Sequence, residues 1–215
     1  MESIVRCEKI GSLGSGSDVV PGRSGHRIVC VADEIYVIGG YVQLPTGLKV
    51  LGEVWIYNLL AKRWRRLNLP NFPFQLALSA SVLVVGKHIL IHGGTGFPFA
   101  EAINNTIIQI DVATGQCKEH ECIPKDGENK NLPEATYGHS LTYVNLPKDN
   151  PEGHDPSSLG RAMLIKVGGA RGVPYSNVVS AFSFSTGTWE KLFGDDGMES
   201  MATFSPRFAV ILSLF

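Results

Sequence analysis

The chain has 215 residues, of which 44% are hydrophobic and 18% charged, and its formal net charge at pH 7 is -1. This composition is that of a globular protein and excludes a general attraction to nucleic acid or to acidic membranes. The 24 glycines and 12 prolines, without any long amphipathic helical pattern, predict an all-β protein with short strands and many turns.

Three hydrophobic runs each end at a glycine pair, namely Gly39-Gly40, Gly93-Gly94 and Gly168-Gly169. A glycine pair that ends a hydrophobic run and recurs after about 50 residues is typical of kelch repeats. Each kelch repeat forms one four-stranded blade of a β-propeller. A blade buries its faces only against neighbouring blades. The sequence therefore predicts a partial kelch-type β-propeller of three four-stranded blades and the first strand of a fourth, with two radial faces left open.

The predicted elements follow one another along the chain as repeats. Residues 1–22 are an N-terminal segment, either flexible or a closing strand. Kelch repeats are expected over 23–70, 71–132 and 133–204, the third with an inserted surface loop at about 144–161, and a fourth would start at 205–215. Ala32-Asp33 and Gly86-Lys87 are predicted as hairpin turns in the first two repeats.

Neither end of the sequence carries a membrane signal. Residues 1–20 lack the apolar core of a signal peptide, and the apolar run at 208–215 is far shorter than the ~20 residues that cross a bilayer. We expect a protein of the cytoplasm or the nucleus, without a membrane partner.

Several residues that recur between repeats are interpreted as structural. His26 and His139 each follow a glycine at the start of a repeat, and Trp64 and Trp189 open its last strand, where the second repeat has Cys117. We interpret these histidines, and His88 and His92, which have no evident carboxylate partner, as hydrogen-bonding groups and not as acid–base catalysts. Cys30 and Cys117 are interpreted as small core residues.

No motif predicts catalysis, a cofactor or a metal. Cys117, His120 and Cys122 offer three ligands within one strand, but zinc prefers four and the sequence places no fourth. The glycine-rich stretches at 11–16 and 94–96 do not lie between a strand and a helix, as phosphate-binding loops do. Because no nucleophile is paired with a base, we expect a protein that is not an enzyme.

The stretch Lys62-Arg63-Trp64-Arg65-Arg66 is a basic cluster around an aromatic residue. It could contact phosphate or act as a localisation signal. We favour charges turned outward on an edge strand, where Lys and Arg discourage pairing with other strands.

Four stretches together resemble the first blades of the kelch-domain substrate receptors of cullin-RING ubiquitin ligases, over about residues 23–169. They are Arg23-Ser24-Gly25-His26, Gly39-Gly40-Tyr41, Glu53-Val54-Trp55-Ile56-Tyr57 and Gly93-Gly94-Thr95-Gly96-Phe97-Pro98-Phe99. The resemblance implies a six-bladed propeller, a C-terminal helical box that binds elongin and a cullin scaffold, and recognition of substrate C-terminal ends, often at glycine. No segment here matches that box, so elongin and cullin are expected as partners only of a full-length relative.

The connections after the glycine pairs are predicted to gather on one face of the propeller. They span 41–50, 95–104 and 170–176, and they combine aromatic side chains with one guanidinium suited to a peptide carboxylate. The resemblance places Tyr41 in the peptide pocket. A competing interpretation is that Phe97, Pro98 and Phe99 only fix a long loop to its blade. The candidate peptide-binding residues are Tyr41, Thr95, Phe97, Phe99, Arg171 and Tyr175.

These observations predict a protein-interaction module, with protein partners or substrate C-terminal peptides. The first hypothesis is the substrate-recognition propeller of a cullin-RING E3 ubiquitin ligase. The alternatives are a non-catalytic kelch scaffold for a cytoskeletal or signalling partner, and a truncated isoform without ligase activity.

Overall fold

The computed structural model describes residues 20–69, 78–101, 103–127, 129–146, 161–172 and 175–194. These residues form strands and two short 3-10 helices. The elements, in order, are β1 (Arg27–Val31), β2 (Glu34–Ile38), β3 (Tyr41–Leu44), β4 (Gly47–Val50), β5 (Val54–Asn58), β6 (Arg63–Leu67), β7 (Ser81–Val85), β8 (His88–His92), β9 (Ile107–Asp111), β10 (Cys117–His120), β11 (Ile123–Pro124), η2 (Lys125–Gly127), η3 (Asn129–Asn131), β12 (Ser140–Leu146), β13 (Arg161–Ala170), β14 (Tyr175–Ser183) and β15 (Thr188–Phe193).

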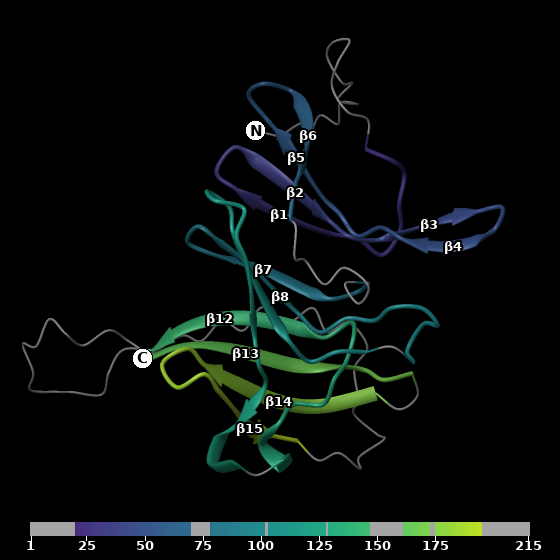
Figure 1. The fold of residues 1–215 in the computed structure, drawn as a ribbon. Coiled ribbons are helices and arrows are strands. Elements are labelled where there is room, and N and C mark those ends of the chain that lie inside the picture. Colours follow the sequence, from purple (N-terminus) through teal and green to yellow (C-terminus); the bar gives the residue numbers. More distant parts are fainter. Residues whose placement is uncertain are drawn as a thin grey trace, which may run out of the picture.

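The strands build three successive antiparallel blades, as Figure 1 shows. Blade 1 has the order β1-β2-β5-β6, blade 2 has β7-β8-β9-β10, and blade 3 has β12-β13-β14-β15 with the short β11 added in parallel at its outer edge. The hairpin turns predicted at Ala32-Asp33 and Gly86-Lys87 join β1 to β2 and β7 to β8. The sheets of the described residues do not close into a ring, which confirms the predicted partial propeller. Most of the N-terminal segment, most of the inserted loop and the start of the fourth repeat lie outside the described residues.

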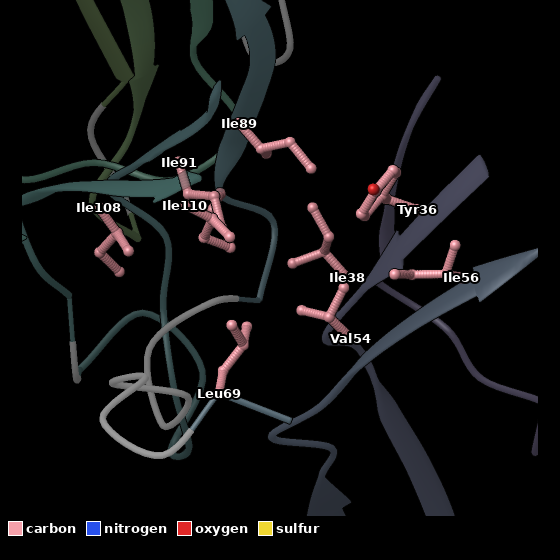
Figure 2. Packing of buried hydrophobic residues seen from close by; sticks show 10 residues of the cluster. Tyr36, Ile38, Val54, Ile56, Leu69, Ile89, Ile91, Ile108 and Ile110 are labelled. Atoms are coloured by element: carbon pink, nitrogen blue, oxygen red, sulfur yellow. The ribbon is translucent and has the colours of Figure 1, made fainter. Parts of the chain in front are cut away.

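The core between blades 1 and 2 is mainly aliphatic, with Tyr36 as its one aromatic residue among the described residues. Because side chains alternate between the two faces of a strand, each blade sends one apolar face to either neighbour. Figure 2 shows the two facing sets meeting, with Ile38 and Ile56 from blade 1 opposite Ile89 and Ile110 from blade 2. Most of this cluster is almost completely buried. At the usual ~25 cal/mol per Å² of buried apolar surface, this interface is a main source of stability.

The second core, between blades 2 and 3, uses larger side chains. Leu90 and Ile107 from blade 2 pack against Leu164, Phe182 and Trp189 from blade 3. The Phe182 and Trp189 rings lie 5.4 Å apart. These two residues are cross-strand partners, as are Tyr57 and Trp64 in blade 1 and Ile110 and Cys117 in blade 2. Trp64, Cys117 and Trp189 therefore occupy the same position in their blades.

The interpretation of Cys30 as a core residue was wrong. Cys30 is exposed, because it lies on the face of β1 that points away from the core shared with blade 2. Its neighbours Val29 and Val31 occupy the buried face. Cys117, by contrast, packs against this core.

The blades are linked at the start of their innermost strands by a repeated backbone contact. The Ser79 amide donates to Gly25 O at 3.4 Å, and the Gly138 amide donates to Ser79 O at 2.9 Å. All three residues have positive φ, 65° at Gly25, 51° at Ser79 and 68° at Gly138. Ser79 thus adopts the conformation that glycine adopts in the other two repeats, which keeps the link despite the different sequence.

Replacing Ser79 with glycine is expected to stabilise the protein slightly. A left-handed conformation costs a non-glycine residue about 1–2 kcal/mol, and the greater entropy of unfolded glycine offsets about 0.5–1 kcal/mol of this. The net gain of about 0.5–1 kcal/mol in the free energy of unfolding corresponds to a rise in Tm of about 1–4 °C, measurable by thermal denaturation. Ser79→Val should melt below the wild type. A glycine variant that melts below the wild type would contradict the strain argument.

Candidate functional site

The glycine pairs bring each connection close to the start of an innermost strand. The residue after each glycine pair forms an antiparallel bridge with a residue just before the innermost strand of a blade. The three bridges join Tyr41 to Ser24, Thr95 to Leu78, and Ala170 to Tyr137. The close approach requires glycine, since a Cβ on Gly40 would lie 2.8 Å from Ser24 O and one on Gly169 would lie 2.7 Å from Thr136 Oγ1. The three connections therefore leave the blades in equivalent positions.

The first connection is a β-hairpin, not the loop that the sequence predicted. Strands β3 and β4 pair in register from Tyr41 opposite Val50 to Leu44 opposite Gly47. The residues flanking Pro45 and Thr46 are mostly apolar or β-branched, which favours strands on both sides of a turn. In Figure 1 this hairpin projects beyond the sheet of blade 1.

Aromatic contacts join the second connection to the first connection and to the start of the third repeat. The rings of Tyr41 and Phe97 meet edge to face at 5.7 Å, and those of Phe99 and Tyr137 at 4.8 Å. Tyr137 is buried, whereas Phe99 remains 46% exposed. Phe97 and Phe99 thus fix the second loop against its neighbours while Phe99 still presents a ring surface. These contacts are compatible with both interpretations of the loop, namely that it binds a peptide and that its aromatic residues fix it to its blade.

Thr95 lies beneath this surface. Its side chain is completely buried, and its hydroxyl accepts a hydrogen bond from the Ala100 amide at 3.0 Å. Thr95 therefore shapes the loop from 95 to 100 and has no exposed atoms to offer a ligand.

Arg171 stands at the other end of the row, paired with a carboxylate. Its Nη1 lies 2.5 Å from Glu134 Oε1, and the two side chains are 49% and 29% exposed. A Cβ on the adjacent Gly172 would lie 3.6 Å from Ala100 Cβ, so this turn lies next to the second loop. Tyr175, which follows the turn, is 45% exposed. An incoming carboxylate would have to share the guanidinium with Glu134 or displace it.

A buried lysine holds the segment that carries Glu134. Lys166 is 1% exposed, and its Nζ donates to the Glu134 carbonyl at 2.8 Å. Burial lowers the pKa of Lys166 to about 8, against the opposing influence of the nearby Glu134 carboxylate. Sequence reasoning missed Glu134, and it missed the buried Tyr137, which packs against Phe99. We call Tyr41, Phe97, Phe99, Tyr137, Glu134, Arg171 and Tyr175 together the loop face.

Below the loop face, two histidines meet between blades 2 and 3. His92 Nδ1 lies 2.9 Å from His139 Nε2, and His139 Nδ1 lies 3.3 Å from Thr136 Oγ1. Both rings are buried, and this desolvation lowers both pKa values, that of His92 to about 3. The expectation that His88 lacks a carboxylate was wrong, because its Nε2 lies 3.6 Å from Asp111 Oδ2 on the neighbouring strand.

The three ligands considered for a metal have separate partners. His120 Nε2 lies 2.9 Å from Gln109 Oε1, and Cys122 Sγ donates to Asn105 O at 2.8 Å, while Cys117 packs in the other core. Within the described residues, no group of three or more His, Cys, Asp or Glu side chains is placed to hold a metal ion. The same part of the chain contains no helix long and apolar enough to span a membrane.

The repeated blades, glycine pairs and inter-blade contacts define a kelch-type β-propeller segment. The model of the Kelch motif matches residues 22–68. The solved structure of YjhT, a kelch-type propeller, has the same fold, with a TM-score of 0.60 at 17% identity over 87% of this chain and 57% of its own.

With its Kelch motif, the chain resembles Kelch domain-containing protein 10. It is 27% identical to that protein of Xenopus tropicalis over 230 residues, which is 84% of this chain and 54% of the relative. The human protein is 28% identical over 183 residues, 80% of this chain and 36% of the relative. The Drosophila melanogaster homolog is 28% identical over 184 residues, 80% of this chain and 27% of the relative. The chain thus spans about half or less of these relatives, and the relationship supports a protein-interaction module.

Proposed function

We propose that this chain is the substrate-recognition part of a cullin-RING ubiquitin ligase and that its loop face binds the C-terminal end of a substrate protein. The observation that carries the proposal is the row of aromatic rings from successive repeats that ends at the half-exposed Arg171. A guanidinium pairs with a carboxylate through two parallel hydrogen bonds, and aromatic rings cover the adjoining peptide backbone. The protein acts by binding, not by catalysis.

The arrangement suits a small C-terminal residue. The carboxylate must come close to Arg171 while Glu134 remains nearby as a competing acceptor. A terminal glycine allows this approach because it has no side chain to clash with the turn at Arg171 and Gly172. Glu134 can then accept a hydrogen bond from a peptide amide once the carboxylate has taken a share of the guanidinium.

The ligase role extends this recognition to the rest of the assembly. In a full-length relative, the resemblance implies a helical box that binds elongin and a cullin scaffold, and the bound substrate is then ubiquitinated. Such a receptor acts in the cytoplasm or the nucleus, where we place this protein.

Replacing Arg171 with alanine is expected to weaken binding of a C-terminal glycine peptide about tenfold, equivalent to about 1.4 kcal/mol. The loss is moderate because the side chain is half exposed, and pairs at the rim of an interface contribute less than fully buried ones. The measurement is a titration of labelled peptides by fluorescence anisotropy. Tyr41→Ala should also weaken binding, and Lys87→Ala, at the opposite end of blade 2, is the matched control.

An amidated peptide tests the role of the carboxylate directly. It should bind the wild type as weakly as the free-acid peptide binds Arg171→Ala. Equal binding of the amidated and free-acid peptides would refute recognition of C-terminal ends. The chain would then be better described as a kelch scaffold for another kind of partner.

A further inference from the structure

The outer edges of the three blades differ in what covers them. In blade 3, β11 lies parallel to the edge strand β15, with Ile123 opposite Thr188 and Pro124 opposite Trp189. The next residue, Lys125, places its Nζ 2.8 Å from Glu190 Oε2 on β15. Blade 3 therefore shows that an outer edge of this propeller accepts a short parallel strand followed by an ion pair.

The edge of blade 1 has the same geometry with reversed charge. Trp64 and Trp189 occupy equivalent positions, because each lies opposite the aromatic residue of the preceding strand. Arg65 of β6 consequently corresponds to Glu190 of β15. Strand β6 is the last strand of its sheet, and no strand of the described residues pairs with its outer side.

The charges on β6 and the preceding turn are largely available to a partner. Arg65 and Arg66 pair with Glu34 and Glu53, but their side chains remain 52% and 59% exposed. Exposed Lys62 and Arg63 have no carboxylate partner among the described residues. The corresponding strand of blade 2, β10, reads Cys-Lys-Glu-His and has no comparable excess of positive charge.

The turn before β6 also differs from its counterparts. Lys62 has φ 51° where the other two blades have Gly115 and Gly187, both at 69°. Leu60 in the same turn is 81% exposed. A side chain at such a φ costs about 1–2 kcal/mol, and an exposed leucine contributes no core packing. This turn thus gives up stability to present an apolar tip and a positive charge beside the open edge.

We propose that β6 binds an extended acidic segment of a partner protein as an added parallel strand of blade 1, with an acidic side chain over Arg65 in the way that Lys125 lies over Glu190. Main-chain hydrogen bonds to a strand edge provide affinity, and side-chain charge provides selectivity. The basic residues repel a second basic strand edge, which prevents unspecific pairing. They attract an acidic strand. This surface lies on the outer rim of blade 1 (Figure 1) and is independent of the loop face.

The test uses two labelled peptides that differ only in the residue after an Ile-Pro pair, glutamate in one and lysine in the other. The wild-type chain is expected to bind the glutamate peptide about tenfold more tightly, because one peptide offers an ion pair and the other a repulsion. The preference should decrease as salt screens the charges. Arg65→Glu should invert the preference, since it recreates the charge of Glu190.

Three controls separate this pairing from a change in folding or net charge. Lys118→Glu changes the equivalent position of β10 by the same charge and should leave the preference intact. Thermal denaturation of each variant shows that it is folded, and Arg65→Gln keeps a polar side chain without the charge. Equal binding of the two peptides to the wild type would overturn the proposal, as would an equal effect of Lys118→Glu. Dimerisation of the chain through β6, abolished by Arg65→Glu, would identify a second copy as the occupant and would also overturn it.

Discussion

Replacing Gly93 with alanine is expected to destabilise the protein by about 3 kcal/mol, a large part of the stability of a typical domain. Gly93 has φ +65°, which costs a side chain about 1–2 kcal/mol, and overpacking adds a similar amount. A Cβ at this position would lie 2.6 Å from Thr136 O and 2.7 Å from His139 Cε1. Thr136 O cannot move away freely because it accepts a hydrogen bond from the Gly94 amide.

Gly86→Ala is the matched control for this substitution. Gly86 has a similar φ of +57°, but a Cβ there would meet nothing within 4 Å. Gly86→Ala should therefore lower the free energy of unfolding only by the cost of the positive φ, about 1 kcal/mol. Urea denaturation of the two variants and the wild type gives both values. Equal losses would mean that the close contact at Gly93 has no energetic consequence and that conformation alone explains the glycine pair.

The overall fold could be predicted because its signals are local and repeated. Gly40, Gly93 and Gly169 stand where the backbone passes too close to a neighbour for any side chain, so the sequence must show glycine there. The turns at 32–33 and 86–87 are similarly visible as short polar breaks between apolar strands. Each repeat shows this constraint as a glycine in its own sequence, even where the close neighbour belongs to the next repeat, as at Gly93, so it can be read by comparing repeats.

Contacts between residues far apart in the sequence could not be predicted in the same way. Arg171 is separated from Glu134 by 37 positions and His92 from His139 by 47, and neither pair has a sequence pattern of its own. The burial of Thr95 could not be predicted, because a threonine after a glycine pair occurs in exposed loops as well as in buried positions. The β3–β4 hairpin was missed because the position of the connection after a glycine pair suggested a loop more strongly than its own residues suggested strands.

Acidification from about pH 7.5 to about pH 5 is expected to destabilise the wild-type protein through His92 and His139. Burial lowers the folded-state pKa of His92 to about 3 and that of His139 well below its usual value, with Lys166 near both rings and Arg27 near His139 opposing protonation further. The unfolded histidines bind protons near pH 6.5. Because the unfolded state then carries more protons, stability is full above pH 6.5 and falls as the pH decreases toward the folded-state pKa.

At about pH 5, each of the two buried histidines should lower the free energy of unfolding by about 2 kcal/mol. This value follows from about 1.36 kcal/mol for each pH unit below 6.5. The carboxyl groups with lowered pKa values, such as Glu34 and Glu53, lose their contribution only at lower pH, near and below 4.5. The measurement is the free energy of unfolding in urea as a function of pH. His139→Ala, which places at this position the residue that repeat 2 has at Ala80, and His92→Leu should each be less stable at neutral pH and show a flatter pH dependence. A wild-type stability that does not change between these pH values would show that the two rings take up protons in the folded state as readily as in the unfolded chain.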